Sequence, residues 1–330
     1  MDDQEPAGAI GMTRALSISN LPTPKEESWK YTNLPRALPQ GLTAAAPEEV
    51  VIHKKRGEVC GEPVDIVWAG LHGQMHAPVL NIEIEPNSEL FIIERNEGQG
   101  AYWKNAATSI KIGDNAKLVH IRIQEDSAES INTNMVDIAL GRDAHYDSFT
   151  LNLGGKLTRH EIRAVLNGPG AEIHLNGLNL LKGKQHGDTT ILVEHAAPNC
   201  QSNQFYRSIL DDESRGVFQG KVHVHKIAQK TDGYQLSNTI LLSPKAEMDT
   251  KPELEIYADD VKCSHGATCG QLDEAPLFYL RSRGLNEAEA RLLLIRAFVD
   301  EVVDKIGDEG VRATISGKVS GWLKDALAHA

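Results

Sequence analysis

Apolar residues recur at every second position over much of the chain between residues 50 and 260. Four of the clearest runs are Leu80/Ile82/Ile84, Val119/Ile121/Ile123, Phe149/Leu151/Leu153 and Val222/Val224. This alternation is typical of β-strands that bury one face and leave the other in water. Turn-forming residues such as Gly168-Pro169-Gly170 and Thr231-Asp232-Gly233 separate the runs. The pattern therefore predicts a long succession of short strands.

No stretch with a helical period lies between these strands, which excludes alternating βαβ units and a doubly wound sheet. Three architectures remain for the strand region: a sandwich, a closed barrel and a coiled β-solenoid. A solenoid with coils of roughly 20 residues or more would complete about ten turns here. No strict motif repeats from coil to coil, so the spacing favours the solenoid only slightly.

The period of the apolar positions changes at Asp273, which is expected to be the N-cap of a helix that ends at Gly284. Asn286 and Glu289 have capping-box spacing and predict a second helix, and a third, short helix is expected around residues 322–327. The apolar positions of the first two helices include Leu277, Phe278, Leu280, Leu292, Leu293, Ile295, Val299, Val302, Val303 and Ile306. We expect one face of this unit to pack on the strands and another to meet a partner.

Prolines at positions 22, 24, 35 and 39 interrupt the start of the chain and favour an irregular structure there. The predicted organisation is an N-terminal segment at 1–48, a strand core at 49–270 and a helical domain at 271–330. The acidic start, residues 1–5, lacks the basic and apolar regions of a secretory signal, so none is expected.

Composition narrows the classes of function. The 330 residues include 34 Lys+Arg against 46 Asp+Glu, and the resulting charge of −12 argues against binding to nucleic acid or to an anionic membrane surface. No apolar run approaches the roughly 20 residues of a membrane helix. Four cysteines, at 60, 200, 263 and 269, form neither a disulfide framework nor a CxxC zinc pair. The expected compartment is therefore the cytoplasm.

The sharpest candidate for chemistry is Cys263-Ser264-His265. In an extended segment this spacing places the thiol and the imidazole on the same side, and both groups suit iron, zinc or copper. By spacing alone, a buried thiol beside a hydrogen-bonded histidine is the favoured interpretation. Cys269 is either a third ligand or, more consistent with its type, a small packing residue.

A second pair, His223-Val224-His225, shares one face of a strand, but two ligands need a third, so an exposed pair without metal is favoured. Weaker candidates are His72 with His76, the cluster Asp211-Asp212-Glu213, and Asp259-Asp260. Acidic runs at strand ends are usually solvated turns. The chain has no G-x-S-x-G elbow, no Walker-type loop and no G-x-G-x-x-G after a strand, so the residues alone do not support an enzyme.

Several motifs, taken in order, resemble the SufB/SufD family of iron–sulfur cluster assembly proteins. They are residues 26–34 (EESWKYTNL), 214–221 (SRGVFQGK), 235–238 (QLSN), 241–243 (LLS), 251–256 (KPELEI), 260–268 (DVKCSHGAT) and 278–285 (FYLRSRGL). The chain is similar to the SufD branch rather than to SufB, which has E-H-E-A-T where residues 264–268 read SHGAT. SufB also carries a cysteine in a Q-C-D-S-L-L segment, where this chain has none, so that thiol would come from a partner.

The resemblance implies a right-handed parallel β-helix (β-solenoid) core with a small C-terminal helical domain. Only about 25 residues precede the W-K-Y-T motif, so the N-terminal helical domain is expected to be truncated to a short irregular segment. The implied role is a non-enzymatic subunit of the SufBCD scaffold. It would pair with SufB through the ends of the two β-helices and bind the SufC ATPase through its helical domain.

The same resemblance implies functional residues. His265, with Cys263, is expected to be a ligand of a transient iron–sulfur cluster or iron at the SufB–SufD interface, with nothing tightly bound when the protein is isolated. Phe278, Tyr279 and Leu280 are expected to contact SufC. The chain is expected to form homodimers when alone.

Two other classes stay open from the residues themselves. One is a secreted-type β-helix enzyme that acts on acidic polysaccharide through Asp211-Asp212-Glu213 with calcium and Arg207 or Arg215. The missing secretion signal and an aromatic content of 5% argue against it. The other is a free-standing homodimeric structural protein whose β-helix ends pair with each other.

Overall fold

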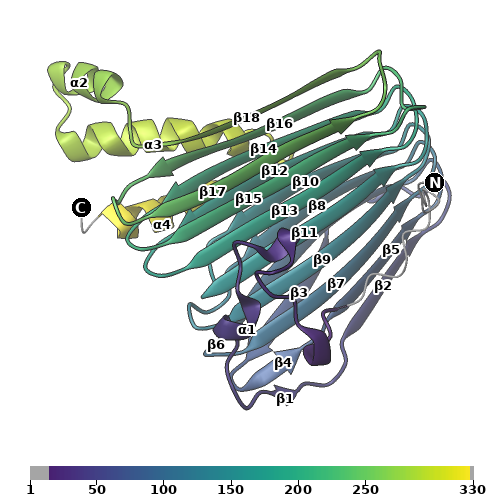
Figure 1. Ribbon diagram of the computed structural model, residues 1–330, viewed down its shortest axis with the longest axis horizontal. Coiled ribbons are helices and arrows are strands. Elements are labelled where there is room, and N and C mark those ends of the chain that lie inside the picture. Colours follow the sequence, from purple (N-terminus) through teal and green to yellow (C-terminus); the bar gives the residue numbers. More distant parts are fainter. Residues whose placement is uncertain (1–14, 328–330) are drawn as a thin grey trace.

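The computed structural model describes residues 15–327, and its strands form two stacked parallel sheets (Figure 1). Sheet A contains β1 (Thr43–Ala44), β2 (Glu49–Lys54), β4 (Gln74–His76), β5 (Val79–Ile84), β7 (Trp103–Ile112), β9 (Ile131–Leu140), β11 (Leu157–Leu166), β13 (His186–His195), β15 (Arg215–Val224) and β17 (Glu247–Ile256). Sheet B contains β3 (Val64–Leu71), β6 (Glu89–Gln99), β8 (Lys117–Gln124), β10 (His145–Asn152), β12 (Glu172–Leu181), β14 (Gln201–Leu210), β16 (Asp232–Leu241) and β18 (Lys262–Gly270). The chain alternates between the two sheets, which makes a two-sided solenoid.

The register shows how long each coil is. Trp103 lies beside Ile131, Ile131 beside Leu157, Leu157 beside His186, and His186 beside Arg215, all in parallel. One coil therefore uses 26 to 29 residues here, and the eight strands of sheet B correspond to eight coils rather than about ten. The coil length agrees with the expected length of roughly 20 residues or more, but the expected number of about ten turns was too high, because each coil holds two strands of about ten residues plus two turns. The solenoid is confirmed, and the sandwich and barrel alternatives are wrong.

The interior between the sheets is apolar on one side and polar on the other. Apolar side chains that fill the first side include Leu80, Ile92, Ile110, Leu118, Ile138, Leu166, Ile173, Leu175, Val193 and Phe218. On the polar side His120 Nε2 lies 3.1 Å from Glu94 Oε2, and Lys104 Nζ lies 2.8 Å from Asp126 Oδ1. Burial raises the pKa of the Glu94 carboxyl, but the contacts with His120 and Arg122 outweigh burial and hold that pKa well below its usual range. These buried charges are therefore paired, as low polarity requires.

The helices follow the last strand. They are α2 (Glu274–Ser282), α3 (Glu287–Val303) and α4 (Glu309–Leu327). Asp273 caps α2 by accepting from Ala275 N, and Asn286 forms a complete capping box with Glu289 at the start of α3, as predicted. In contrast, the third helix was predicted too short.

Helix α4 begins at Glu309, 13 residues before the predicted start at 322. Glycines at 310, 317 and 321 lower its intrinsic helix propensity. Val311, Ile315 and Val319 nevertheless recur every four residues and are buried. Packing of this apolar face stabilises the helix despite the glycines. The spacing of four residues between its apolar positions was the sequence signal that could have revealed the helix.

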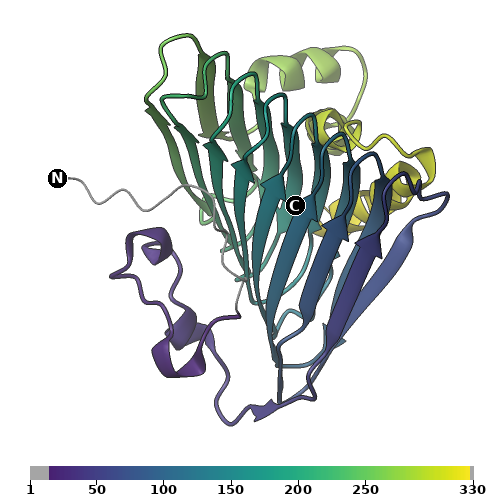
Figure 2. The ribbon, with the colours of Figure 1, turned by 90° about the vertical axis from the view of Figure 1, so that its right-hand side faces the viewer.

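Helices α3 and α4 lie against the outer face of sheet B (Figure 2). Their buried residues, including Ile295, Val299, Val302, Ile315 and Leu323, form one cluster with Ile121, Leu151, Leu180 and Ile209 of the sheet. The Arg207 guanidinium lies between the rings of Phe205 and Phe298, at 4.9 and 4.5 Å from their centroids, and pairs with Glu301. Lys318 Nζ is 2.6 Å from Glu125 Oε2 and ties α4 to the loop after β8. The helices are thus an integral layer of the fold.

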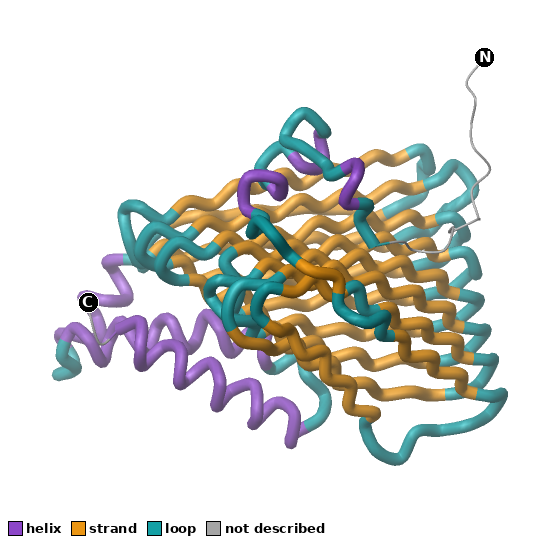
Figure 3. Tube along the Cα trace, turned by 90° about the horizontal axis from the view of Figure 1, so that it is seen from below, coloured by secondary structure: helices purple, strands orange, loops and turns teal. Residues whose placement is uncertain are grey.

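The N-terminal segment lies on the opposite side, against sheet A (Figure 3). It contains three short helical turns, η1 (Ile18–Asn20), η2 (Glu27–Trp29) and α1 (Leu34–Ala37). Trp29 is buried, and the Arg159 guanidinium lies 4.0 Å from the centroid of the Trp29 ring. Gln219 Nε2 donates a hydrogen bond to Ser28 O at 3.0 Å. Lys251 Nζ pairs with Glu27 at 2.7 Å. The motif at 26–34 therefore holds the segment on the solenoid.

Within residues 15–327, the helices are all too short or too polar to span a bilayer. The acidic start at 1–5, used above to argue against a secretory signal, lies outside the described residues.

Candidate functional site

The end of the solenoid at β17 and β18 has two edge strands of opposite character. In β17, Glu247, Asp249, Lys251, Glu253 and Glu255 occupy the outward positions, and Pro252 removes one backbone donor. Charges and proline are devices that discourage a further strand. Strand β18 instead carries small residues, KCSHGATCG, and pairs only with β16 among the described residues. The backbone groups on its outer edge are free to accept another strand.

Cys263 lies in β18 and points into the solenoid. It is in register with Gly233 of β16, where an added Cβ would come within 3.3 Å of Cys263 Sγ. The half-buried sulfur packs against Val222 and Val224. Burial raises the pKa of the Cys263 thiol, more than the Gly233 backbone hydrogen bond lowers it, so the neutral thiol is the resting form.

His265 is two residues further along β18 and therefore on the same face as Cys263. Its register partner is Gln235, which in turn lies beside Gln204 and donates to that side chain through Nε2 at 2.7 Å. The Gln235 amide needs Gly220 across the interior, since a Cβ there would come within 1.9 Å of Nε2. Gln235 Oε1 has no hydrogen-bond partner among the described residues. His265 thus ends a polar interior row and is exposed because no coil follows it.

Cys269 does not join this pair. Six residues of extended strand separate it from Cys263, and at about 3.3 Å per residue this is roughly 20 Å. One metal ion cannot bind both sulfurs. Any metal or cluster at Cys263 and His265 therefore needs ligands from outside the described chain.

The second predicted contact surface is on α2. Phe278 and Tyr279 are 74% and 57% exposed, whereas Leu280 is half-buried and Leu277 is buried. Exposed Leu292 and Leu293 of α3 extend the apolar surface. Figure 1 shows α2 projecting beyond the solenoid. We call Phe278, Tyr279, Leu292 and Leu293 the α2–α3 patch.

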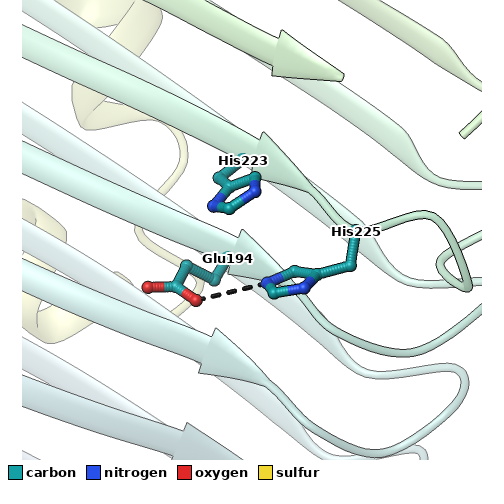
Figure 4. A group of neighbouring side chains, drawn as sticks. All are labelled: Glu194, His223 and His225. Carbon is teal, nitrogen blue, oxygen red and sulfur yellow. Dashed lines mark hydrogen bonds and ion pairs between the residues drawn. The ribbon is translucent and has the colours of Figure 1, made fainter. Parts of the chain in front are cut away.

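The remaining candidates divide into two kinds. His72 and His76 are structural, because they accept backbone hydrogen bonds from Ala101 N and Leu71 N. His223 and His225 are joined by Glu194 of β13, and the three ligand atoms lie within 4.8 Å of one another (Figure 4). The sequence favours an exposed histidine pair without metal; the structure adds Glu194, one coil earlier, as a third potential ligand that no local pattern indicates.

The polysaccharide alternative finds no assembled site. Asp212 occupies a turn with φ 52° and accepts from Gly183 N, and Glu213 pairs with Lys245 at 3.5 Å. Arg207 is buried beneath α3, and Arg215 is held by Asp249 at 2.6 Å. The acidic cluster is a solvated turn, and neither arginine accompanies it.

Comparison with known proteins points to one family. Residues 67–298 match the family model described as "SUF system FeS cluster assembly, SufBD core domain". An iron–sulfur cluster assembly SufBD family protein of Synechocystis is 40% identical over 244 residues, covering 70% of this chain and 53% of the relative. The iron–sulfur cluster assembly protein SufD of Escherichia coli is 34% identical over 289 residues, covering 87% and 66%.

A chloroplastic protein of Arabidopsis thaliana, ABCI7, is 32% identical over 292 residues, covering 84% of this chain and 61% of the relative. The chain thus spans between about half and two thirds of the length of these relatives. The matched region includes both β18 and the start of the helical layer, where the two candidate surfaces lie. On the extent of the family match and the identity to SufD-type relatives, the chain belongs to the SufBD core family of the SUF iron–sulfur cluster assembly system.

Proposed function

We propose that the protein is a SufD-like scaffold subunit that works in iron–sulfur cluster assembly by supplying ligands and surfaces, without catalysing a reaction itself. The observation that carries this proposal is the position of Cys263 and His265, neighbours on the inward face of the edge strand β18. A partner that docks at this edge would cover both side chains and complete their coordination.

Pairing with SufB would use β18 rather than β17. The free edge of β18 carries small residues that let another backbone approach, and strand addition would satisfy its N–H and C=O groups. The outward charges of β17 are already engaged, for example Arg215 with Asp249 and Lys221 with Glu255. A second copy of this chain could use the same edge, which gives homodimers when the protein is alone.

Coordination by Cys263 and His265 would follow partner docking. The exposed imidazole of His265 can present a neutral nitrogen, the form that binds iron. The Cys263 thiol, whose pKa burial raises, would release its proton to solvent when iron binds, because the positive charge of the iron stabilises the thiolate. The two residues leave at least two positions of a tetrahedral iron open, which SufB would fill. The bound iron or cluster is cargo, held transiently.

The SufC ATPase would dock on the α2–α3 patch. Exposed aromatic and aliphatic side chains of this kind form the energetic centre of protein interfaces. Phe278 and Tyr279 would be the main anchors, whereas Leu280 would contribute less because it is already half-buried.

A contact chain links the helical layer to β18. Arg207 contacts Phe298 and Glu301 of α3. When the Asn238 amide is oriented to suit its neighbours, its oxygen accepts from Arg207 Nη1 at 3.0 Å and from Thr268 Oγ1 of β18 at 3.1 Å. A shift of α3 on ATP hydrolysis would therefore reach the strand that carries Cys263.

The ligand proposal is tested by His265→Ala in a complex co-expressed with SufB and SufC and purified without oxygen. The complex should assemble with normal stoichiometry, while its cluster absorption in the visible range falls to near background. His145→Ala, which removes a partly exposed histidine of β10, four coils from β18 along sheet B, is the control and should retain the absorption. Normal cluster yield from a fully assembled His265→Ala complex would remove His265 from the site.

The SufC proposal is tested by Phe278→Asp with Tyr279→Asp. This double variant should lose SufC in pull-down while its circular dichroism and its SufB binding are unchanged. Leu71→Asp, which adds a negative charge at an exposed apolar position of β3, at the opposite end of sheet B from β18, should retain SufC. Full SufC retention by the double variant would refute the assignment. Removal of the whole helical layer is a poor test, because it would expose the apolar outer face of sheet B.

A further inference from the structure

We propose that Glu194, His223 and His225 form a surface site for a divalent first-row transition metal, separate from Cys263 and His265. Two imidazoles and one carboxylate are a donor set that such metals prefer, and three protein ligands leave positions open for exchange. Among residues 15–327 it is the only group of three or more histidine, cysteine or acidic ligands close enough to share an ion.

The parallel register builds the site. Glu194 of β13 lies directly beside His223 of β15, so the two side chains project from neighbouring strands on the same outer face of sheet A. His225 follows two residues later, and its backbone N–H donates to His195 O, which extends the pairing past the end of β15. Because residues i and i+2 of a strand share a face, both imidazoles point to the side where Glu194 lies (Figure 4).

The three side chains need only small rotations to bind an ion. The ligand atoms lie within 4.8 Å of one another, and His225 Nε2 is already 3.3 Å from Glu194 Oε2. Bonds of about 2.0–2.1 Å in a tetrahedral site place ligand atoms roughly 3.3 Å apart. The rings of His223 and His225 stack with centroids 4.5 Å apart and planes at 17°, so His223 must turn to aim its lone pair at the ion. All three residues are partly exposed, which leaves room for this turn.

The neighbours of His223 hold its ring beside Glu194. Glu255 of the neighbouring strand β17 is the register partner of His223. Its carboxylate pairs with Lys221 and accepts from Tyr257 Oη at 2.5 Å. Tyr257 also meets the His223 ring edge-on, with centroids 5.6 Å apart. These neighbours limit how far His223 can move away from Glu194.

This site does not depend on the proposed scaffold role. It lies on the outer face of sheet A, whereas Cys263 and His265 lie on the inner face of sheet B at the edge strand. Its test therefore uses the purified chain without SufB or SufC, and its outcome leaves the cluster proposal untouched.

The experiment titrates chelator-treated protein with Zn²⁺ by calorimetry and with Co²⁺ by visible absorption, which reports coordination. The unmodified protein should bind one equivalent more than the Glu194→Gln/His223→Ala/His225→Ala variant. Each single substitution should weaken this binding by more than the ~10- to 100-fold typical of losing an outer-shell partner. The Cys263→Ser/His265→Ala variant should still bind this additional equivalent of metal ion.

His145→Ala is the matched control: His145 pairs with Glu172 at 3.2 Å on an adjacent strand, but the nearby His174 pairs with Asp147 at 2.7 Å, and these side chains do not form a three-ligand group. It should leave the binding unchanged, and circular dichroism should be the same for all variants. Equal Zn²⁺ stoichiometry in the unmodified protein and the folded triple variant would overturn the proposal. Loss of the equivalent in Cys263→Ser/His265→Ala alone would overturn it as well, by assigning the ion to β18.

Discussion

Replacing Asp126 with asparagine should strongly destabilise the solenoid, because Asp126 neutralises a buried ammonium group. The Lys104 side chain is 1% exposed, and its Nζ donates to Asp126 Oδ1 at 2.8 Å, to Trp68 O at 2.7 Å and to Glu97 O at 3.2 Å. In Asp126→Asn the ammonium keeps only neutral acceptors. Breaking a buried pair in this way costs about 3–5 kcal/mol of the free energy of unfolding.

Removing the other partner of the pair, by Lys104→Met, should cost less: about 1–3 kcal/mol of the free energy of unfolding. The Asp126 carboxylate would keep three donors: Tyr102 Oη, Gln124 Nε2 and Asn132 Nδ2, the last at 2.9 Å. A carboxylate with several hydrogen bonds remains stable when buried, whereas an ammonium facing two carbonyls does not. The structure thus predicts an order of the two costs, with Asp126→Asn the larger.

Urea denaturation followed by circular dichroism would measure both costs, at pH 7 and again near pH 9.5. Burial lowers the pKa of the Lys104 ammonium from its ordinary 10.5, and the charge of Asp126 partly offsets this effect. Without Asp126, the pKa of Lys104 in the folded protein falls further below its value in the unfolded chain. At a pH between these two pKa values, the unfolded chain therefore binds more protons than the folded protein. In this range the free energy of unfolding of Asp126→Asn rises with pH, so its loss of stability relative to the unmodified protein should shrink toward pH 10. A Lys104→Met cost equal to or above that of Asp126→Asn, or a deficit independent of pH, would refute the reasoning.

Three further predictions concern the fold. Burial lowers the pKa of His195 to about 4, with Ser202 Oγ 2.8 Å from Nε2, so the folded state excludes a proton that the unfolded state binds below pH 6.5. Stability on the order of 3 kcal/mol should therefore be lost as pH falls from 6.5 to 4, and His195→Gln should flatten this part of the urea-midpoint profile. Gly168→Ala would place a Cβ 2.0 Å from Arg142 N in the adjacent coil, so its thermal midpoint should fall by several degrees; an unchanged midpoint would contradict the close contact. Ile295→Ala, a fully buried α3 position, should cost about 2–5 kcal/mol and increase hydrogen exchange first in α3 and α4, and exchange rising first in β15 would argue against the docked layer.

Local patterns were sufficient for the elements. The period-two run at Val222/Val224 is part of β15, and both residues are buried on the inner face as expected. Asn286 and Glu289 form the capping box that their spacing predicted. These features depend on residues within one turn or one strand of each other, so they can be read without the fold. Residues 309–321 of helix α4 escaped detection because the glycines there lower the helix propensity, and the packing face that compensates for them is stabilised only by the sheet.

Motif order was sufficient for the family, and it singled out Cys263 and His265 as candidate ligands without indicating their exposure or environment. A neighbour in a parallel solenoid is one coil away along the chain, and the coil length is set by two strands and two irregular turns. Glu194 and His223 are 29 positions apart and lie side by side, an adjacency that no local pattern records. The same holds for His265, which is exposed because β18 happens to be the last strand. The sequence by itself therefore determined the strands, the capped helices and the family. The tertiary structure decided the coil length, the open edge and the grouping of distant ligands, since these arise from the non-local stacking of coils.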